Sequence, residues 1–505
     1  MYAKIQSSAI VGLKSLVLDI EVTIRNGTGT FVTVGLPDLA VRESRDRVLS
    51  ALRYTGNGLV GKNCTVNLAP ASIRKEGPVY DLPIALGIIL ASHSQKQNLL
   101  EGYLILGELA LDGKVRPVRG VLPAAIGCKQ LGFKGMILPQ ENVSEAAFVE
   151  GIHIVGITNL TQAIGFLVGE WTPPPVVPKS LNSEFSFVDC DFSEVKGQVA
   201  VKRALTIAAT GFHNMLMIGP PGCGKTLMAK RLPSIMPNLS FQEALEVSKI
   251  HSVMGMLPPD QGLVLQRPFR TPHHTISEAG LVGGGTHPHP GEISLAHYGI
   301  LFLDELPEFR KRTLEVLRQP LEDQKVTISR VNGSYTFPCS TLLVATMNGC
   351  PCGQRGLESE SCRCTEWQVK SYRGRISTPL LERIDLHIEV RPVEFQEITQ
   401  NNQAESSETL RAKVLQTQQI QQKRFQNEWK KNGQMSPKEV EQFCELGSQE
   451  NKLLEMAMKN LKLSARSLSK IRKIARSIAD LDAQEKINCE HLSEAVHYRT
   501  LDKWN

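Results

Sequence analysis

The run Gly219–Thr226, with the sequence GPPGCGKT, constrains the fold of this chain more than any other segment. It fits the pattern G-x-x-x-x-G-K-[ST] and stands between the apolar segment Met215–Ile218 and the helix-favouring segment Leu227–Leu232. Its glycines allow backbone N–H groups to turn toward phosphate oxygens, and the N-terminus of the following helix adds a favourable potential. The sequence therefore predicts a strand, a phosphate-binding loop and a helix in direct succession.

The loop predicts a site for ATP and Mg²⁺. Lys225 is expected to reach the β- and γ-phosphates, and the hydroxyl of Thr226 is expected to join the Mg²⁺ shell. A chance glycine-rich turn is the alternative, and the flanking strand and helix oppose it. The residues of the loop predicted to bind the nucleotide are Gly219, Pro220, Pro221, Gly222, Cys223, Gly224, Lys225 and Thr226.

A second motif, GILFLDEL at Gly299–Leu306, ends an apolar strand with two acids. Ligands of α/β sheets bind at the carboxyl ends of the strands, so both acids are predicted to lie beside the nucleotide. We expect Asp304 to hold Mg²⁺ through water, and Glu305 to orient and polarise the attacking water. Many strands end in acids, so this assignment depends on the loop upstream.

Two further polar residues follow in the order expected for such a site. Asn348 ends a buried strand, TLLVATMN, where it could position the same water, although a turn or cap role is the alternative. Arg383, in LLERIDL, precedes a final strand, and an arginine there can act across a subunit boundary on a neighbour's γ-phosphate. The alternative for Arg383 is a surface salt bridge with Glu382 or Asp385.

A run of prolines at 171–178, WTPPPVVP, divides the chain and is typical of a stiff linker. Apolar segments in mixed order precede it and favour an α+β domain, whereas strands alternating with helices follow it and favour a parallel α/β sheet. Beyond Phe395 the spacing is helical. The predicted parts are a first domain at 1–170, a linker at 171–189, an ATPase core at 190–394 and a helical lid at 395–505.

Within the predicted core, a hairpin interrupts the alternation of strands and helices. Asn332-Gly333 is a favourable two-residue turn flanked by β-branched residues. The strands predicted for the core are Met215–Ile218, Ile300–Leu303, the hairpin strands Val326–Ser329 and Tyr335–Phe337, Thr341–Ala345 and Leu386–Val390.

The overall composition sets few limits. The chain has 505 residues, of which 41% are hydrophobic and 21% charged, and a formal net charge of +6. These values are ordinary for a globular protein, and they tolerate a polyanionic partner without requiring one. No signal-peptide pattern begins the sequence, and the most apolar stretch, Leu82–Ala91, is too short to span a bilayer. We therefore expect a cytoplasmic protein without a membrane partner, with mostly reduced cysteines.

Four cysteines lie in two C-x-C pairs, Cys350 with Cys352 and Cys362 with Cys364. Four thiolates on one short loop suit a tetrahedral zinc ion. The spacing is tighter than that of the usual C-x₂-C knuckle, and the alternative is four free thiols in a flexible loop. The first pair begins two residues after Asn348, so a zinc site here is predicted to brace the end of that strand.

Together these residues resemble the AAA+ ATPases of the magnesium-chelatase-like group, and in particular the ComM (YifB) family of bacterial DNA branch-migration helicases. The resemblance covers nearly the whole chain. Beyond the nucleotide motifs it rests on Val22–Leu90, the stretch RTPHHTISEAGLVGGGTHPHPGEISLAHYGILFLDELPEF and the C-terminal LSARSLSKIRKIARSIADL. It implies an N-terminal Lon-protease-like α+β domain, an AAA+ parallel-sheet core, a C-terminal helical lid and a homo-hexameric ring.

The resemblance also implies that the N-terminal domain has no peptidase chemistry. Gly77–Asp81 falls where the Lon protease carries Gly-Pro-Ser-Ala-Gly, and Val79 takes the place of the serine. Leu122 stands in the segment that carries the catalytic lysine of the protease. A Ser–Lys dyad needs both groups, so the domain is expected to serve in binding or assembly.

The same resemblance assigns residues to a DNA-binding channel. The stretch with His287 and His289 corresponds to the helix-2 insertion, a loop that faces the channel, and a plain loop is the alternative. A metal site that adds His273 and His274 is disfavoured, since prolines alternate with the later pair and favour an extended loop.

The predicted hairpin corresponds to the pre-sensor hairpin of related helicases, so Arg330 and Tyr335 are expected to meet phosphate and base. The alternative is an ordinary hairpin with an exposed arginine. Arg466 resembles the sensor-2 arginine that touches bound nucleotide, and Arg472 is the second candidate for that role.

Three functions remain open at this point. The first is an ATP-driven DNA motor that promotes branch migration in homologous recombination during natural transformation, with single-stranded and branched DNA as partners. The second is a chelatase-type motor subunit that acts on protein partners, and the Lon-like domain opposes it because chelatase motor subunits lack that domain. The third is a Lon-like protease, which Val79 and Leu122 oppose.

Overall fold

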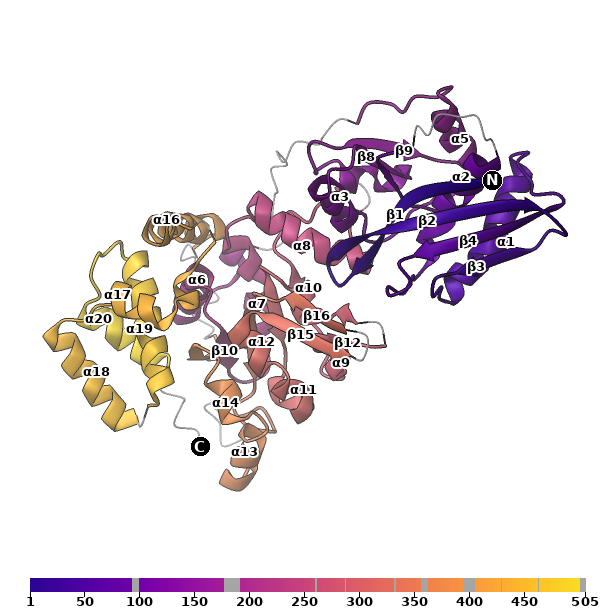
Figure 1. Ribbon diagram of the computed structural model, residues 1–505. Helices are drawn as coiled ribbons and strands as arrows, with labels where there is room; N and C mark the ends of the chain where they lie inside the picture. The colour runs from indigo at the N-terminus through magenta and orange to yellow at the C-terminus, as the bar shows by residue number, and fades with distance from the viewer. Residues whose placement is uncertain are drawn as a thin grey trace. The chain divides into compact units, whose positions relative to one another are not determined.

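The structure is a computed structural model that describes residues 1–92, 100–176, 191–258, 261–286, 288–330, 333–355, 362–393, 405–427, 429–461 and 463–499 (Figure 1). Its contacts divide the chain into a first unit, Met1–Ser183 with Ser240–Leu265, and a second unit, Glu184–Leu239 with Gln266–Asn505. The four sequence-based boundaries remain predictions. The segment Ser240–Leu265 lies inside the range predicted for the ATPase core, but it packs with the N-terminal residues.

A mixed sheet organises the first unit. In the described residues its seven strands have the order β3-β4-β2-β1-β5-β8-β9. The pairs β1–β2 and β2–β4 are antiparallel, and the other neighbouring pairs are parallel. The strands are β1 (Tyr2–Val11), β2 (Lys14–Asn26), β3 (Phe31–Val34), β4 (Lys62–Ala69), β5 (Tyr103–Ile105), β8 (Gly135–Pro139) and β9 (His153–Ile157). A separate ribbon pairs β6 (Glu108–Leu109) with β7 (Val115–Arg116).

Helices cover both faces of this sheet, because alternate strand residues point to opposite sides. Ile105 belongs to the hydrophobic cluster that contains residues of α1, α2 and α5, whereas Leu104 belongs to the cluster that contains residues of α3. The helices are α1 (Leu39–Tyr54), α2 (Asp81–Ser92), α3 (Val121–Gln130), α4 (Val143–Ala146) and α5 (Leu160–Val168). The predicted α+β character of this region is confirmed.

Helix α8 (Phe241–Met254) packs against α3 and so joins the first unit. The backbone N–H of Gly120 donates to the carbonyl of Ser252 at 3.1 Å, and the hydroxyl of Ser252 donates to the buried carboxylate of Glu145. Gly262 has a φ of +69°, and a Cβ there would meet the carbonyl of Ser144, so the close approach requires glycine. Leu263 then fills the α3 cluster.

The second unit contains the predicted parallel sheet, in the order β11-β14-β17-β10-β18 with every neighbouring pair parallel. The predicted strands at Met215–Ile218 and Ile300–Leu303 are confirmed with the same bounds. The strands are β10 (Met215–Ile218), β11 (Phe269–Arg270), β14 (Ile300–Leu303), β17 (Leu342–Met347) and β18 (Leu386–Glu389). The helices are α6 (Val199–Gly211), α7 (Lys225–Ile235), α9 (Glu278–Val282), α10 (Glu292–Leu295), α11 (Lys311–Glu315), α12 (Arg318–Asp323), α13 (Glu366–Arg373) and α14 (Thr378–Leu381).

The predicted hairpin is confirmed as β15 (Lys325–Arg330) paired with β16 (Gly333–Pro338). Gly333 pairs with Arg330, so Gly333 belongs to the strand and not to the turn predicted for Asn332-Gly333. Asn332 itself lies outside the described residues. A short ribbon of β12 (Gly283–Gly284) with β13 (His289–Pro290) contacts β15.

The C-terminal helices pack onto this sheet domain. Figure 1 shows them in yellow beside α6, and α19 contacts α6. They are α16 (Ser407–Phe425), α17 (Pro437–Phe443), α18 (Ser448–Leu461), α19 (Ala465–Leu481) and α20 (Cys489–His497), which confirms the predicted helical region. Among the described residues, no helix combines the length and apolar character needed to cross a bilayer.

The predicted linker begins without regular structure. Residues 171–176 form neither helix nor strand, and 177–189 lie outside the described part of the chain. The backbone N–H of Trp171 donates to the carbonyl of Gly165 at 3.1 Å, and its side chain packs against the first unit's core.

Candidate nucleotide site

The sheet order brings the predicted nucleotide residues to one edge. β17 lies between β14 and β10, and all three strands are parallel, so their carboxyl ends lie side by side. Lys225 begins the helix after β10, Asp304 follows β14, and Asn348 follows β17. Residues that are far apart in sequence therefore meet where α/β sheets bind ligands.

The loop after β10 encloses the ammonium group of Lys225. Gly222 and Gly224 adopt φ angles of +80° and +87°, which an L side chain rarely adopts, and these turns wrap the loop around the lysine. The Nζ atom donates to the carbonyls of Gly219 and Pro220 at 2.7 and 2.8 Å, and lies 3.4 Å from Oδ1 of Asn348. Lys225 is only 8% exposed. A buried ammonium with uncharged partners is well matched to an incoming phosphate.

Hard oxygen donors stand beside the lysine. The hydroxyl of Thr226 donates to Oδ2 of Asp304 at 3.0 Å, and the hydroxyl of Thr346 donates to Oδ1. Hydroxyl and carboxylate oxygens are the ligands Mg²⁺ prefers, directly or through water, so the donor set fits that ion. Thr346 was not among the residues predicted from the sequence, although it is a lone hydroxyl inside the apolar strand β17.

Glu305 is held in an unusual backbone conformation. Its φ is +54°, in the left-handed region, and its N–H donates to Oγ1 of Thr346 at 3.1 Å. Non-glycine residues in this region cost free energy and are frequent at functional sites. The result is an exposed carboxylate directly beside Asp304.

Helix α13 fixes the turn that follows β17. The hydroxyl oxygen of Tyr372 accepts the backbone N–H of Asn348, and burial raises the pKa of this tyrosine to about 12. The Nε and Nη2 atoms of Arg373 donate to the carbonyl of Gly349 at 3.3 and 3.1 Å. Neither contact could be predicted from the sequence, because nothing in the local pattern connects α13 with Asn348.

Comparisons with known proteins agree with this geometry. The family described as "Magnesium chelatase, subunit ChlI" matches residues 191–398, and related descriptions match residues 20–142 and 404–499. Competence protein ComM of Haemophilus influenzae is 40% identical over 504 residues, which are 99% of this chain and 97% of that protein. The YifB protein of Escherichia coli is 40% identical over 501 residues, with the same coverage.

The chain belongs to the ComM family of magnesium-chelatase-like proteins. The family carries an AAA+ core, which implies the use of nucleotide and Mg²⁺. Lon protease 2 of Bacillus subtilis is 28% identical over 144 residues, 28% of this chain and 25% of that protein, in keeping with a Lon-like N-terminal domain.

Val79 and Leu122, which the resemblance aligns with the serine and lysine of the protease, both lie in apolar surroundings. Leu122 is fully buried and Val79 is partly buried in the same hydrophobic cluster. The backbone N–H of Leu122 donates to Oε1 of Glu145 at 2.7 Å. Apolar packing therefore surrounds both residues, and the lack of peptidase chemistry in this domain stays a prediction.

The four predicted zinc ligands come together in space. The sulfur atoms of Cys350, Cys352, Cys362 and Cys364 all lie within 4.8 Å of one another, and no other such group of His, Cys, Asp or Glu occurs among the described residues. The backbone N–H of Arg355 donates to the sulfur of Cys350 at 3.4 Å. The Gln354 N–H and neighbouring thiols lower the pKa of Cys352 to about 7. This donor set fits a tetrahedral metal.

The two predicted nucleotide-sensing arginines lie near each other on one carboxylate of their own chain. Arg383 and Arg466 both form ion pairs with Glu322, and no described contact joins either to Lys225 or Asp304. The salt bridges considered for Arg383 with Glu382 and Asp385 are absent from the described contacts. Arg472, the second candidate, donates to the carbonyl of Cys444 at 3.1 and 2.7 Å within the helical region.

The predicted DNA residues occupy neighbouring elements. Arg330 is exposed at the end of β15, and its Nε lies 3.4 Å from the carbonyl of Gly285 in the loop between β12 and β13. His289 is exposed in β13, and His287 lies outside the described residues. Tyr335 pairs with Ile328, two residue pairs back from the last described pair of the hairpin, Arg330 with Gly333, and is half-buried.

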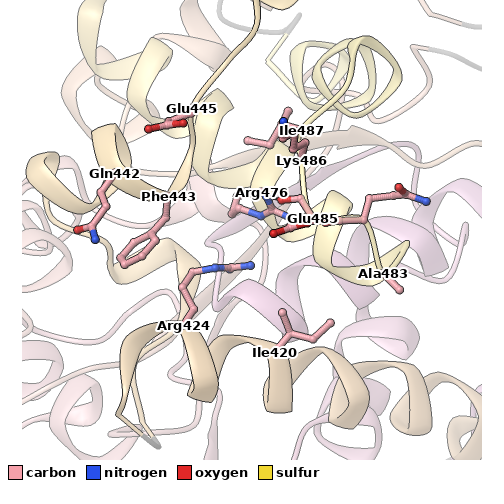
Figure 2. Close-up of a pocket in the computed structure, with 11 residues that line it drawn as sticks. Ile420, Arg424, Gln442, Phe443, Glu445, Arg476, Ala483, Glu485, Lys486 and Ile487 are labelled. Atoms are coloured by element: carbon pink, nitrogen blue, oxygen red, sulfur yellow. Dashed lines mark hydrogen bonds between the residues drawn. The ribbon is translucent and has the colours of Figure 1, made fainter.

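A cavity of about 490 Å³ lies in the helical region, away from the phosphate loop. Figure 2 shows Arg424 and Arg476 in its lining. Both arginines already pair with the buried carboxylate of Asp480, at 2.5 and 2.9 Å. These two arginines are therefore satisfied by the chain itself, and the residues predicted to bind the nucleotide lie elsewhere, at the sheet edge.

Proposed function

We propose that this chain is an ATP-driven motor that works as a homo-hexamer on single-stranded and branched DNA, and promotes branch migration in homologous recombination during natural transformation. The observation that carries the proposal is the path of the chain from the nucleotide edge into the hairpin. β16 leads into β17, which contains Thr346 beside Asp304 and is followed directly by Asn348. Full-length similarity to a competence protein supports DNA as the partner.

Each residue of the edge has a role in this proposal. Lys225 binds the β- and γ-phosphates, Thr226 and Asp304 hold Mg²⁺, and Mg²⁺ neutralises charge on the phosphate oxygens. Glu305 and Asn348 position the attacking water. Arg383 of the adjacent subunit stabilises charge on the transferred phosphate, and Arg466 of the helical region touches the bound nucleotide.

The hairpin and the β12–β13 loop would contact DNA inside the ring. Arg330 is exposed and its described partner is a neutral carbonyl, so its guanidinium can donate hydrogen bonds to a DNA phosphate. Such contacts release counterions and weaken as salt rises. The exposed imidazole of His289 is available on the adjacent ribbon.

Zinc in the Cys350–Cys364 cluster is a further part of the proposal. A closed four-thiolate site would join the turn after Asn348 to the start of α13, whose residues Tyr372 and Arg373 hold that turn. Elemental analysis of untagged protein should find about one zinc per chain. Metal-free protein with full activity would contradict a zinc role.

Branch migration of a four-way DNA junction tests the proposal. Wild-type protein should move the junction with ATP, and Glu305→Gln should bind ATP without moving it. Arg330→Ala should keep basal ATP hydrolysis, lose most migration and show a salt dependence of DNA binding that is shallower by about one phosphate contact.

Lys325→Ala, at the base of the same hairpin, is the matched control and should retain most migration. Active ATPase that leaves every junction unmoved would reject the DNA motor and favour the chelatase-type motor with a protein partner.

A further inference from the structure

Two arginines from distant parts of the second unit converge on one carboxylate. Glu322 lies in α12, and its Oε2 accepts a hydrogen bond from Nη2 of Arg383. Its Oε1 accepts from Nη2 of Arg466 at 3.2 Å. Arg383 precedes β18 of the sheet, whereas Arg466 belongs to α19 of the helical region. The side chain of Glu322 therefore connects the sheet domain with the helical region by binding one arginine from each.

Arg383 is anchored on three sides by its own chain. Besides the bond to Glu322, Nε donates to the carbonyl of Arg318 at 2.7 Å, and Nη1 donates to the carbonyl of Pro379 at 2.7 Å. Its side chain is only 14% exposed. Each Nη nitrogen carries a second N–H, so the group still has donors for an incoming anion. This arginine is fixed in place and does not swing freely.

The charge at this point favours an anion. Two guanidinium groups share one carboxylate, so the cluster of Glu322, Arg383 and Arg466 has one positive charge in excess. The Arg466 pair is largely exposed, at 57% and 50% for the two side chains, and such pairs contribute little to stability. The contact with Arg383 is the stronger of the two, because Arg383 is mostly buried and its other nitrogens are already bonded.

We propose that Glu322 is a positioning residue for ATP hydrolysis in the adjacent copy of this chain. It holds Arg383, and more weakly Arg466, in the geometry that receives the neighbour's γ-phosphate. This inference rests on the proposed role of Arg383 across the subunit boundary. A preorganised cation stabilises the transition state without first losing rotamer freedom, which is a contribution to kcat and not to ATP binding.

The position of Glu322 also connects this cluster with the hairpin. α12 ends at Asp323, and β15 begins at Lys325. A change in the contacts of Glu322 when a phosphate arrives is therefore transmitted over a very short stretch of chain. The arginines of one subunit and its hairpin would then respond together to the nucleotide of its neighbour.

Steady-state ATP hydrolysis by Glu322→Gln tests the inference. The variant should assemble normally, lose on the order of tenfold in kcat and keep its KM for ATP within about twofold, because its own phosphate loop is intact. Asp323→Asn is the matched control, since Asp323 is the next residue of α12 and its described bond is with Gln319. That control should have wild-type kcat and KM.

Two further measurements separate positioning from a general structural role. The double variant Glu322→Gln with Arg383→Ala should be at most slightly slower than Arg383→Ala alone, since Glu322 acts mainly through Arg383 and only weakly through Arg466. Mixing Glu322→Gln with Lys225→Ala protein should restore activity at mixed interfaces, where an intact Arg383 meets an intact phosphate loop. Additive losses in the double variant, or wild-type kcat in Glu322→Gln, would overturn the inference.

The outcomes also distinguish this inference from the function on which it rests. If Arg383→Ala itself is not rescued by Lys225→Ala protein, the role of Arg383 across the boundary fails. If Arg383→Ala is rescued but Glu322→Gln behaves like Asp323→Asn, only the inference fails. Should Glu322→Gln not assemble, Glu322→Asp keeps the charge but is too short to reach both arginines, and full kcat in that variant would overturn the inference.

Discussion

Both units contain a buried lysine that donates to backbone carbonyls near a glycine turn, yet only one belongs to a candidate site. In the first unit, Lys75 is fully buried and donates to the carbonyl of Pro70, and burial lowers its pKa. In the second unit, Lys225 donates to two carbonyls and has Asn348 within reach. Oxygen ligands on adjacent strands surround only the second lysine, so a buried cation alone does not make a site.

Replacing each lysine should show which one supports ATP hydrolysis and which one supports only the stability of the fold. The largest effect on turnover is expected at Lys225. Lys225→Ala should abolish ATP binding and turnover, because the phosphates lose their cation, while the thermal unfolding temperature changes little. Lys75→Met should lower that temperature and leave the turnover of the remaining folded protein unchanged. Equilibrium nucleotide binding and thermal melts check both. Loss of ATP turnover in folded Lys75→Met protein would contradict a purely structural role for Lys75.

A second contrast pairs two buried cysteines. Cys350→Ser should lower kcat for ATP hydrolysis by on the order of tenfold, because the turn at Asn348 loses its brace, and should release the bound metal. Cys128→Ser, in the first unit, should cost stability and leave kcat and metal content unchanged, since Cys128 contacts only the carbonyl of Gly135 at 3.4 Å among its described hydrogen bonds. If Cys350→Ser and Cys128→Ser had the same kcat, the cysteine cluster would have no role in ATP hydrolysis.

Leu122, in the core of the first unit, should respond to truncation as a hydrophobic core residue. Leu122→Ala removes a fully buried side chain and should destabilise the first unit by about 2–5 kcal/mol. ATP affinity should stay unchanged. Urea unfolding followed with nucleotide titration measures both quantities. A change in ATP affinity without a loss of stability would show that this position acts on the nucleotide site.

The smallest effect is expected at Asp385, which anchors the helical region to the sheet. It pairs with Lys470 at 2.6 Å, and although burial acts to raise its pKa, Lys470 and His213 hold that pKa well below its usual range. Asp385→Asn should cost about 1.5–3 kcal/mol at neutral pH.

The pH dependence of this difference follows from the lowered pKa. A carboxylate with a depressed folded pKa contributes stability above its unfolded value of about 3.9 and loses it as the pH falls further. The difference between wild type and Asp385→Asn should therefore be constant from pH 6 to 8 and shrink below about pH 4. A difference that grows as the pH falls would contradict the ion pair.

Local patterns predicted most of the second unit. The runs at Met215–Ile218 and Ile300–Leu303 are apolar throughout and are followed by a glycine and by a pair of acids, so the strands and the points where they end could be read from the sequence. The hairpin was also found, but Gly333, which was predicted to lie in its turn, belongs to the strand. Short-range periodicity does not fix the register of a pairing.

Long-range contacts could not be predicted in the same way. Glu322 meets Arg466 across 144 residues, and Thr346 meets Asp304 across 42, so each contact depends on the sheet order and on lid packing. The docking of α8 on α3 is of the same kind, because a helix in the predicted core range is buried against the first unit. Physical proximity of this type follows only from the assembled fold.

The rate of ATP hydrolysis with and without DNA tests the central claim most directly. Wild-type protein should hydrolyse ATP faster with single-stranded or branched DNA, and the stimulation should decline as salt rises. Arg330→Ala should keep the rate without DNA and lose the stimulation. Equal wild-type rates with and without DNA, at both low and moderate salt, would contradict a DNA motor and leave an ATPase whose partner is not DNA.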